Sequence, residues 1–336
     1  GGNITIYTEL CEQARQEAQP ERDHAQATDP APARNRKCAG REARISASRS
    51  PATMRASDIA TSSPRSTFRP RPAVRPHDNP RELPLVFEYS GLWPHPVSLH
   101  ETLRAEYGHL EFARLQGSYG WVVRYDQARD REASGVRTLG EYLDRFRSPA
   151  PPRLPYLMHL SVNRHLLRLK DRFVLPREFL PNWADLPGLD RISGPELFIG
   201  QAGTGFGPVH LDHVAVHVGF VQLEGEKEFL LFPPEDGRHL YRYPGSQYPW
   251  QLRNSRVRDL SPASLARFPQ LRRTRPRSVV LKAGQALFLP ANWWHTTLNR
   301  TDSVSYSIRI VNHTNVLQTV AEYARGVPRA MARLLG

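Results

Sequence analysis

The chain has 336 residues, of which 24% are charged and 39% are hydrophobic, and its formal net charge is +13. No apolar run approaches the roughly 18–20 residues that a membrane-spanning helix needs. The two cysteines, Cys11 and Cys38, both lie near the N-terminus. The rest of the chain therefore excludes a disulfide framework and a thiolate metal site. Because the N-terminus lacks the apolar core of a secretory signal, we expect a cytoplasmic protein without a membrane anchor.

Residues 1–80 form a Pro-, Arg- and Ala-rich segment that we expect to be disordered. Aromatic residues are few, no apolar period persists, and the segment cannot bury enough surface to offset chain entropy. One hypothesis is that the native protein starts at Met54, with residues 3–53 as translated upstream sequence. Arginines are scattered along the whole chain rather than clustered, which favours an arginine-rich composition over nucleic-acid binding.

In the first half of the ordered region, strands and helices are expected to mix. A helix over 98–107 is expected to begin at Ser98, with Glu101 as its capping-box partner. A second helix, over 138–146, carries apolar residues on one face. Alternating or apolar runs predict strands over 85–89, 110–115, 120–125 and 156–160.

From Glu196 onward, short strands with turn signals between them dominate the pattern. They are predicted over 197–199, 214–223, 228–232, 278–281, 286–289 and 304–311, with an irregular Arg- and Pro-rich insert over 236–277. This pattern predicts a mainly β fold, a double-sheet jelly roll with flanking helices. We expect one domain over 82–312 and a C-terminal helical segment over 313–336, which provides the surface for a possible homodimer.

The residues that indicate chemistry are His210 and Asp212, followed much later by His295. His210 and Asp212 lie two apart, so both side chains point the same way in an extended segment. Two imidazoles and one carboxylate occupy one face of an octahedral metal, and the open positions suit a non-haem Fe(II) that binds a chelating cosubstrate and O₂. His213 and His217 are spare candidates. Each either contacts the metal ligands or the substrate, or is an ordinary, partly exposed histidine of a strand.

At these positions the sequence resembles the JmjC-type, cupin-like hydroxylases, a branch of the Fe(II)/2-oxoglutarate dioxygenases. The resemblance covers roughly residues 82–312. It is carried by the segment 208–212, by Gln222–Lys227 running into 231–234, and by 283–290 running into Trp294-His295. It implies a double-stranded β-helix that holds iron through His210, Asp212 and His295.

The resemblance also implies how 2-oxoglutarate is held. In the family a basic side chain binds the distal carboxylate, and the matching residue is Lys227, with Arg309 as its competitor. A buried carboxylate needs such a charged partner. Tyr156 is expected to assist. The threonine that commonly precedes the first metal histidine by three residues is Gly207 here, so Thr204 is the candidate to replace it.

The implied activity is hydroxylation of an unactivated C–H bond, coupled to oxidative decarboxylation of 2-oxoglutarate. A peptide or protein side chain is the first choice of substrate, and a free amino acid or small metabolite is the alternative. Methyl-lysine demethylation uses the same chemistry. Two other classes stay open, a cupin metalloenzyme that does not use 2-oxoglutarate and a non-catalytic binding module. The insert, Arg238–Arg277, either grips an acidic or extended peptide or only covers the barrel.

Overall fold

The structure is a computed structural model that describes residues 83–115, 134–148, 154–185, 194–243, 253–322 and 324. All of them lie in one compact unit, Ser66–Gly336. The segment 1–80 and the expected strand over 120–125 lie outside the described residues, as does most of 323–336. The expectations for these parts of the chain therefore stay predictions.

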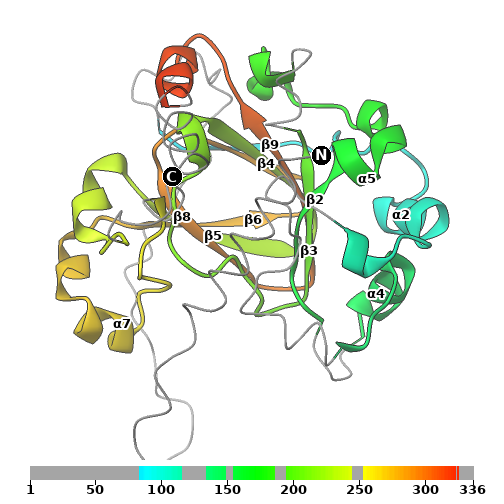
Figure 1. Cartoon of the computed structure of the whole chain (residues 1–336), viewed down its shortest axis with the longest axis horizontal. Coiled ribbons are helices and arrows are strands. Elements are labelled where there is room, and N and C mark those ends of the chain that lie inside the picture. Colours follow the sequence, from blue (N-terminus) through cyan, green and yellow to red (C-terminus); the bar gives the residue numbers. More distant parts are fainter. Residues whose placement is uncertain are drawn as a thin grey trace, which may run out of the picture. The chain divides into compact units, whose positions relative to one another are not determined.

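The described strands form two antiparallel sheets (Figure 1). One sheet has six strands in the order β1-β7-β4-β9-β3-β2, and the other has three in the order β6-β5-β8. The bounds are Leu85–Glu88 (β1), Leu157–Ser161 (β2), Glu196–Gly200 (β3), His217–Glu224 (β4), Glu226–Phe232 (β5), Arg277–Lys282 (β6), Gln285–Leu289 (β7), Trp294–Asn299 (β8) and Ser303–Ile310 (β9).

From β4 onward the chain passes back and forth between the two sheets, since β5, β6 and β8 belong to the small sheet and β7 and β9 to the large one. This winding is that of a jelly roll, so the mainly β prediction is confirmed. The two sheets are not joined by hydrogen bonds into one closed barrel within the described residues. The candidate metal residues, His210, Asp212 and His295, therefore lie between two facing sheets rather than inside one closed barrel.

An apolar core fills the space between the sheets. Val218 and Phe220 of β4 belong to the same buried cluster as Phe229 and Leu231 of β5 and Leu281 of β6. Successive side chains of a strand point to opposite faces, so every second residue of β4 and β5 contributes to this core. This packing joins the two sheets around the candidate metal residues.

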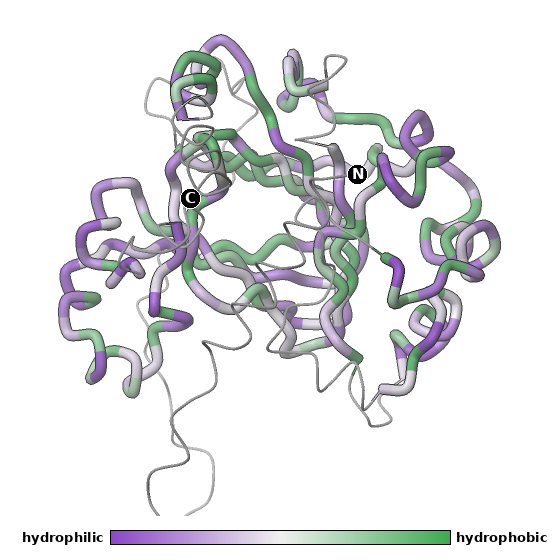
Figure 2. Tube along the Cα trace, in the orientation of Figure 1, coloured by the Kyte–Doolittle hydropathy of each residue, from purple (hydrophilic) through white to green (hydrophobic). Residues whose placement is uncertain are grey.

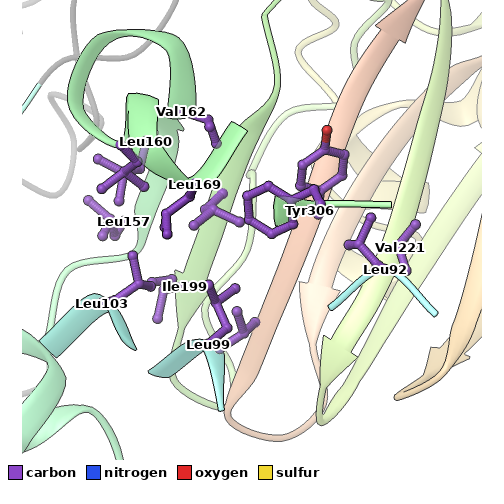
Figure 3. Packing of buried hydrophobic residues seen from close by; sticks show 14 of the residues in the cluster. Leu92, Leu99, Leu103, Leu157, Leu160, Val162, Leu169, Ile199, Val221 and Tyr306 are labelled. Carbon is purple, nitrogen blue, oxygen red and sulfur yellow. The ribbon is translucent and has the colours of Figure 1, made fainter. Parts of the chain in front are cut away.

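A second apolar cluster covers the outer face of the six-stranded sheet. It joins Leu99 and Leu103 of α2 (Leu99–Tyr107) to Leu157 of β2 and Tyr306 of β9, as Figure 3 shows. Helix α4 (Leu139–Phe146) buries its apolar face in the same cluster. In Figure 1, α2, α4 and α5 (Val162–His165) lie together beside β2 and β3.

The two predicted helices form where expected. Ser98 caps α2, since its hydroxyl accepts a hydrogen bond from the amide of Glu101 at 3.1 Å while the Glu101 carboxylate accepts one from the amide of Ser98 at 3.2 Å. This is the predicted capping box. The Thr138 hydroxyl caps α4 by accepting a hydrogen bond from the amide of Glu141 at 3.2 Å, while the Glu141 carboxylate accepts one from the amide of Arg137 at 2.8 Å.

The insert after β5 is folded rather than irregular. It contains η8 (Pro234–His239), α7 (Pro262–Arg267) and η10 (Pro269–Arg273), which lie on the side of the strands opposite α2 (Figure 1). Its own buried cluster joins Leu240, Val257 and Phe268 to Val209 and Trp294. Figure 2 shows hydrophobic residues concentrated along the central strands and mixed with hydrophilic ones around α7. The insert is therefore anchored on the segments that carry the metal-site histidines.

Two predicted strands differ from the structure. Residues 110–115 contain a 3₁₀ turn, η2 (Phe112–Arg114), and only Glu111 makes an isolated bridge, to Thr138. Strand β4 begins at His217 rather than at residue 214, because η7 (His213–Ala215) precedes it with Val214 at φ 53° and Ala215 at φ 50°. A β-branched residue in the left-handed region has no sequence signal, and long-range contacts must hold it there.

Residues 316–322 are helical, in agreement with the predicted C-terminal helix. On this helix Leu317 is 84% exposed and Val320 is 60% exposed. The homodimer expected through this surface stays a prediction. None of the described helices combines the length and the apolarity that are needed to cross a lipid bilayer.

Candidate metal centre

Three side chains, His210, Asp212 and His295, converge between the sheets. One possible ligand atom from each residue lies within 4.8 Å of the others. The Nε2 atom of His295 is 3.6 Å from the Asp212 carboxylate, and the two imidazole centroids are 4.3 Å apart. These distances leave room for a cation between the three ligand atoms. The sequence therefore identified a trio that the fold brings together across 85 residues of chain.

The backbone sets the spacing of the two histidines. His210 and His295 form an antiparallel bridge in which each amide donates to the other residue's carbonyl at 2.9 Å. Residues that face each other in such a bridge carry their side chains on the same side of the sheet. Asp212 follows two residues later in extended conformation, with φ −67° and ψ 151°. This places its carboxylate on the side of His210.

Hydrogen bonds select the tautomer of both imidazoles. The Nδ1 atom of His210 lies 3.1 Å from the carbonyl of Pro208, and that of His295 lies 3.2 Å from the carbonyl of Trp293. A carbonyl can only accept, so each Nδ1 carries the proton and each Nε2 keeps its lone pair. This is the arrangement that metal-binding histidines adopt.

The electrostatics of the site also favour a neutral imidazole at His210. Burial lowers the pKa of His210 well below its ordinary value, and the neighbouring His295 lowers it further. Aromatic rings surround the two histidines, since Phe206 stacks on His210 at 4.0 Å and Phe220 lies 6.3 Å from His295. Two neutral nitrogens and one carboxylate are the donor set that suits a divalent non-haem iron with open positions. The residues present therefore fit the ion that the sequence predicts.

A buried cation lies on the same small sheet as His295. Lys227 of β5 is 2% exposed, and its Nζ donates to the hydroxyl of Tyr156 at 3.2 Å. The ammonium also lies 5.3 Å from the ring centroid of Phe198. Burial alone lowers the pKa of Lys227 to about 7, and no carboxylate in the described part of the chain forms an ion pair with it. Such a group favours an anionic ligand.

Thr204 and Asn299 lie beside this lysine. Asn299 is opposite Lys227 in the β5–β8 register and donates to the Thr204 hydroxyl at 3.0 Å. Gly200 makes this proximity possible, because an added Cβ would lie 2.4 Å from the Tyr156 ring and 2.5 Å from the Asn299 amide. Burial raises the pKa of the Tyr156 phenol, which keeps the hydroxyl protonated. Lys227, Tyr156 and Thr204 thus lie close together around Asn299, and their expected role in holding 2-oxoglutarate stays a prediction.

Arg309, the competing anchor, lies in a different environment. It is 7% exposed on β9, and its guanidinium is 3.5 Å from the carboxylate of Glu196 on β3. The same carboxylate accepts a hydrogen bond from Nδ1 of His159 at 2.7 Å. His159 lies near the metal centre, since Phe206 packs edge-on against it at 5.7 Å and also stacks on His210. The charge of Arg309 is therefore already balanced by a carboxylate.

Sequence reasoning missed His159, Glu196 and Asn299. Asn299 could have been found, because it is four residues after His295 and shares its face of the strand. His159 could not have been found from the sequence. It has φ 56° and lies at a register shift in the β2–β3 pairing, where the irregular backbone turns its side chain inward. Such bulges often re-aim side chains next to active sites.

His217, one of the two further histidine candidates, is not part of the ligand set that the described residues form. Nε2 of His217 lies 2.8 Å from the Thr314 hydroxyl, and its Nδ1 accepts from the amide of Ala291 at 2.9 Å. His217 therefore connects β4 to the C-terminal segment. The side chain of His213 lies outside the described residues.

A double-sheet β protein with two histidines and one carboxylate between its sheets defines a class of metal-binding jelly rolls. The model of the cupin-like domain family matches residues 88–311, more than half of the chain. The chain belongs to this cupin-like family.

Curated relatives match the same region in part. HSPB1-associated protein 1 of Homo sapiens is 33% identical over 157 residues, which cover 46% of this chain and 30% of that protein. Lysine-specific demethylase JMJ30 of Arabidopsis thaliana is 27% identical over 172 residues, 51% of this chain and 37% of that protein. The 2-oxoglutarate and iron-dependent oxygenase JMJD4 of Mus musculus is 26% identical over 163 residues, 47% of this chain and 36% of that protein. The chain thus spans between 30% and 37% of the length of these three relatives.

Proposed function

We propose that this chain is an Fe(II)- and 2-oxoglutarate-dependent oxygenase that hydroxylates an unactivated C–H bond. The observation that carries the proposal is the presence, between the same two sheets, of a His-Asp-His trio and a buried lysine with no carboxylate partner in the described residues. Fe(II) and 2-oxoglutarate are the pair of ligands that these two features would accept together. The names of two of the relatives, the 2-oxoglutarate and iron-dependent oxygenase JMJD4 and the lysine-specific demethylase JMJ30, agree with this chemistry.

In this proposal His210, Asp212 and His295 hold the iron, which supplies O₂ activation coupled to decarboxylation of 2-oxoglutarate. Lys227 and the Tyr156 hydroxyl bind the distal carboxylate of the cosubstrate, because a charge-assisted hydrogen bond compensates for burial of the anion. Thr204 accepts a hydrogen bond from Asn299, which lies opposite Lys227, and so lies close to the proposed position of that carboxylate. The rings of Phe206 and Phe220 limit access of water to the two imidazoles.

We propose a peptide or protein side chain as the substrate because of the insert. Segment 253–257 pairs with 209–211, since the amide of Ser255 donates to the carbonyl of Val209 and the amide of Leu211 to the carbonyl of Arg253, both at 2.8 Å. The insert thus adjoins the metal segment directly. Its exposed arginines include Arg242, Arg256, Arg258, Arg272 and Arg273. A basic surface next to the metal suits an acidic stretch of peptide.

The proposal is tested by adding 2-oxoglutarate anaerobically to Fe(II)-loaded protein and measuring the visible charge-transfer band of the chelate. The wild type should develop the band, and His210→Ala should not. Lys227→Met should bind iron normally but need about tenfold or more 2-oxoglutarate to reach the same signal, because a hydrogen bond between charged groups is lost. Substrates are then sought by succinate release and by the mass gain of one oxygen atom, with acidic peptides compared with neutral ones and with free amino acids.

Two results would contradict the proposal. Wild-type protein that binds Fe(II) but develops no band at saturating 2-oxoglutarate would instead be a cupin metalloenzyme that does not use this cosubstrate. Protein that binds no Fe(II) after anaerobic reconstitution would be a non-catalytic binding module.

A further inference from the structure

Asp212 lies on a stretch of backbone that is not held by a regular sheet. The bridge at His210 is isolated, β4 begins only at His217, and the left-handed residues Val214 and Ala215 lie between them. Left-handed non-glycine residues persist only where surrounding contacts over-determine them. The direction of the Asp212 carboxylate therefore depends on whatever holds residues 211–216.

Arg253, from the insert, holds this stretch at Asp212 itself. Its guanidinium donates to the carbonyl of Asp212 at 2.7 Å, while its own carbonyl accepts from the amide of Leu211 at 2.8 Å. One residue thus fixes the peptide group that precedes Leu211 and the peptide group that follows Asp212, which are the two ends of the Leu211-Asp212 segment. Because both ends of this short segment are held, the φ and ψ angles of Asp212, and with them the direction of its carboxylate, are restricted.

The other end of the Arg253 guanidinium binds the C-terminal helix. Its second terminal nitrogen forms an ion pair with the carboxylate of Glu322, and the two side chains are only 21% and 17% exposed. Ion pairs that are largely shielded from water hold their geometry better than surface pairs, which contribute little. Glu322 therefore keeps the guanidinium oriented toward the carbonyl of Asp212.

The C-terminal segment also binds the left-handed residues directly. The carbonyl of Ala215 accepts hydrogen bonds from the Asn315 amide at 3.1 Å and from the Thr319 hydroxyl at 3.3 Å. We refer to Arg253, Asn315, Thr319 and Glu322 as the C-terminal brace. The brace contacts the backbone on both sides of the metal carboxylate without contributing a ligand.

From these contacts we infer that Arg253 is a positioning residue for the metal carboxylate, and that docking of the C-terminal helix through Glu322 is coupled to metal affinity. The inference rests on the proposed metal site. Coupling is reciprocal, so a metal ion that needs the positioned carboxylate stabilises the docked helix to the same extent that the docked helix stabilises the bound metal. Residues that orient metal ligands typically change metal affinity by about 10- to 100-fold when they are replaced.

The test is titration of full-length protein with Co(II) alone, followed by its visible absorption, which reports both affinity and ligand geometry. Arg253→Met and Glu322→Gln should each weaken Co(II) binding by about tenfold or more, Arg253→Met the more strongly. The melting temperature of the metal-free protein serves to identify variants that merely fail to fold. Arg256→Met is the matched control, because Arg256 is exposed, lies over Tyr243 at 5.9 Å and should leave Co(II) affinity unchanged.

A charge exchange, Arg253→Glu combined with Glu322→Arg, separates positioning from simple helix docking. It restores an ion pair, but a glutamate cannot donate to the carbonyl of Asp212, so affinity should stay low. Full recovery of affinity in the exchange, or wild-type affinity in Arg253→Met, would overturn the inference while the metal site stands. Wild-type protein that binds no Co(II) would remove the metal site, and the inference with it.

Discussion

Among the described residues, two basic side chains, Arg309 and Lys227, are buried between the sheets, and they differ in their counter-ions. Arg309 has the carboxylate of Glu196 at 3.5 Å, which also binds His159. Within the described residues, Lys227 has the neutral hydroxyl of Tyr156 at 3.2 Å and nearby aromatic rings, but no carboxylate. A fully buried charge is costly unless it is paired. Burial of a basic residue is therefore not enough to indicate an anion site. The proposed site at Lys227 rests on the further observation that no carboxylate in the described part of the chain forms an ion pair with it.

The same comparison separates two kinds of contribution to stability. An ion pair that is already formed is lost at a high cost when one partner is removed, because the other remains buried and uncompensated. A buried ammonium without a counter-ion destabilises the folded state until a ligand arrives. Arg309 and Lys227 should therefore respond to the same substitution with opposite signs.

The largest effect is expected at Arg309. Arg309→Met should lower the free energy of unfolding by about 3–5 kcal/mol, because the Glu196 carboxylate is left buried without its guanidinium. Chemical denaturation of metal-free protein measures this. Adding Glu196→Leu to the same variant should recover much of the loss. If Arg309→Met alone changes the free energy of unfolding by less than about 1 kcal/mol, Arg309 is not paired in solution, and the contrast with Lys227 disappears.

An effect of similar size at pH 7 but of opposite sign, which disappears as the pH is raised, is expected at Lys227. The pKa of this lysine is about 7 in the folded protein and lies near 10.5 in the unfolded chain. Between these values the unfolded chain binds more protons, so the stability of the wild type falls as the pH is lowered. Lys227→Met lacks this loss. Its stability advantage should grow by about 1.4 kcal/mol for each pH unit from about 10 down to about 7, then level off.

This pH dependence is measured by denaturation of protein free of metal and 2-oxoglutarate. Lys282→Met provides the control, because that lysine is 68% exposed and should show no such trend. If Lys227→Met is less stable than the wild type at pH 7, the ammonium has a partner and is not reserved for a ligand.

The smallest effect is expected at Tyr156. Tyr156→Phe removes the hydroxyl that accepts from Lys227 but keeps the ring, so 2-oxoglutarate binding to the iron-loaded protein should weaken by about 3- to 10-fold, equivalent to about 1 kcal/mol. Calorimetric titration under nitrogen gives the dissociation constant. Unchanged affinity would place the cosubstrate away from this hydroxyl.

Local patterns in the sequence were sufficient for much of the fold. The capping box at Ser98, the apolar face of 139–146 and the period-two strands after Glu196 all depend on neighbours in the chain. The spacing of His210 and Asp212 also puts both on one side of an extended segment. These features need no knowledge of distant residues, which is why they could be predicted.

Features that arise from long-range contacts could not be predicted. His159 turns inward at a bulge, Val214 adopts a left-handed conformation, and Arg253 meets Asp212 across 41 positions. In each case the local sequence favours another conformation or none, and packing decides. The residues that surround and support the three candidate ligands are thus the ones that sequence patterns describe least well.

The backbone bridge between His210 and His295 has a consequence for how the proposed site would acquire a metal. Both imidazoles are brought face to face by amide–carbonyl bonds and by buried packing, so the chelating pair is assembled by the fold itself. A cation can then leave and be replaced without unfolding. Preassembled nitrogen and oxygen sites bind divalent ions in the order of their intrinsic affinities, in which copper, nickel and zinc exceed iron. Under the proposed function, the ion recovered with the purified protein therefore depends on which metals were supplied, and loading with iron requires exclusion of its competitors.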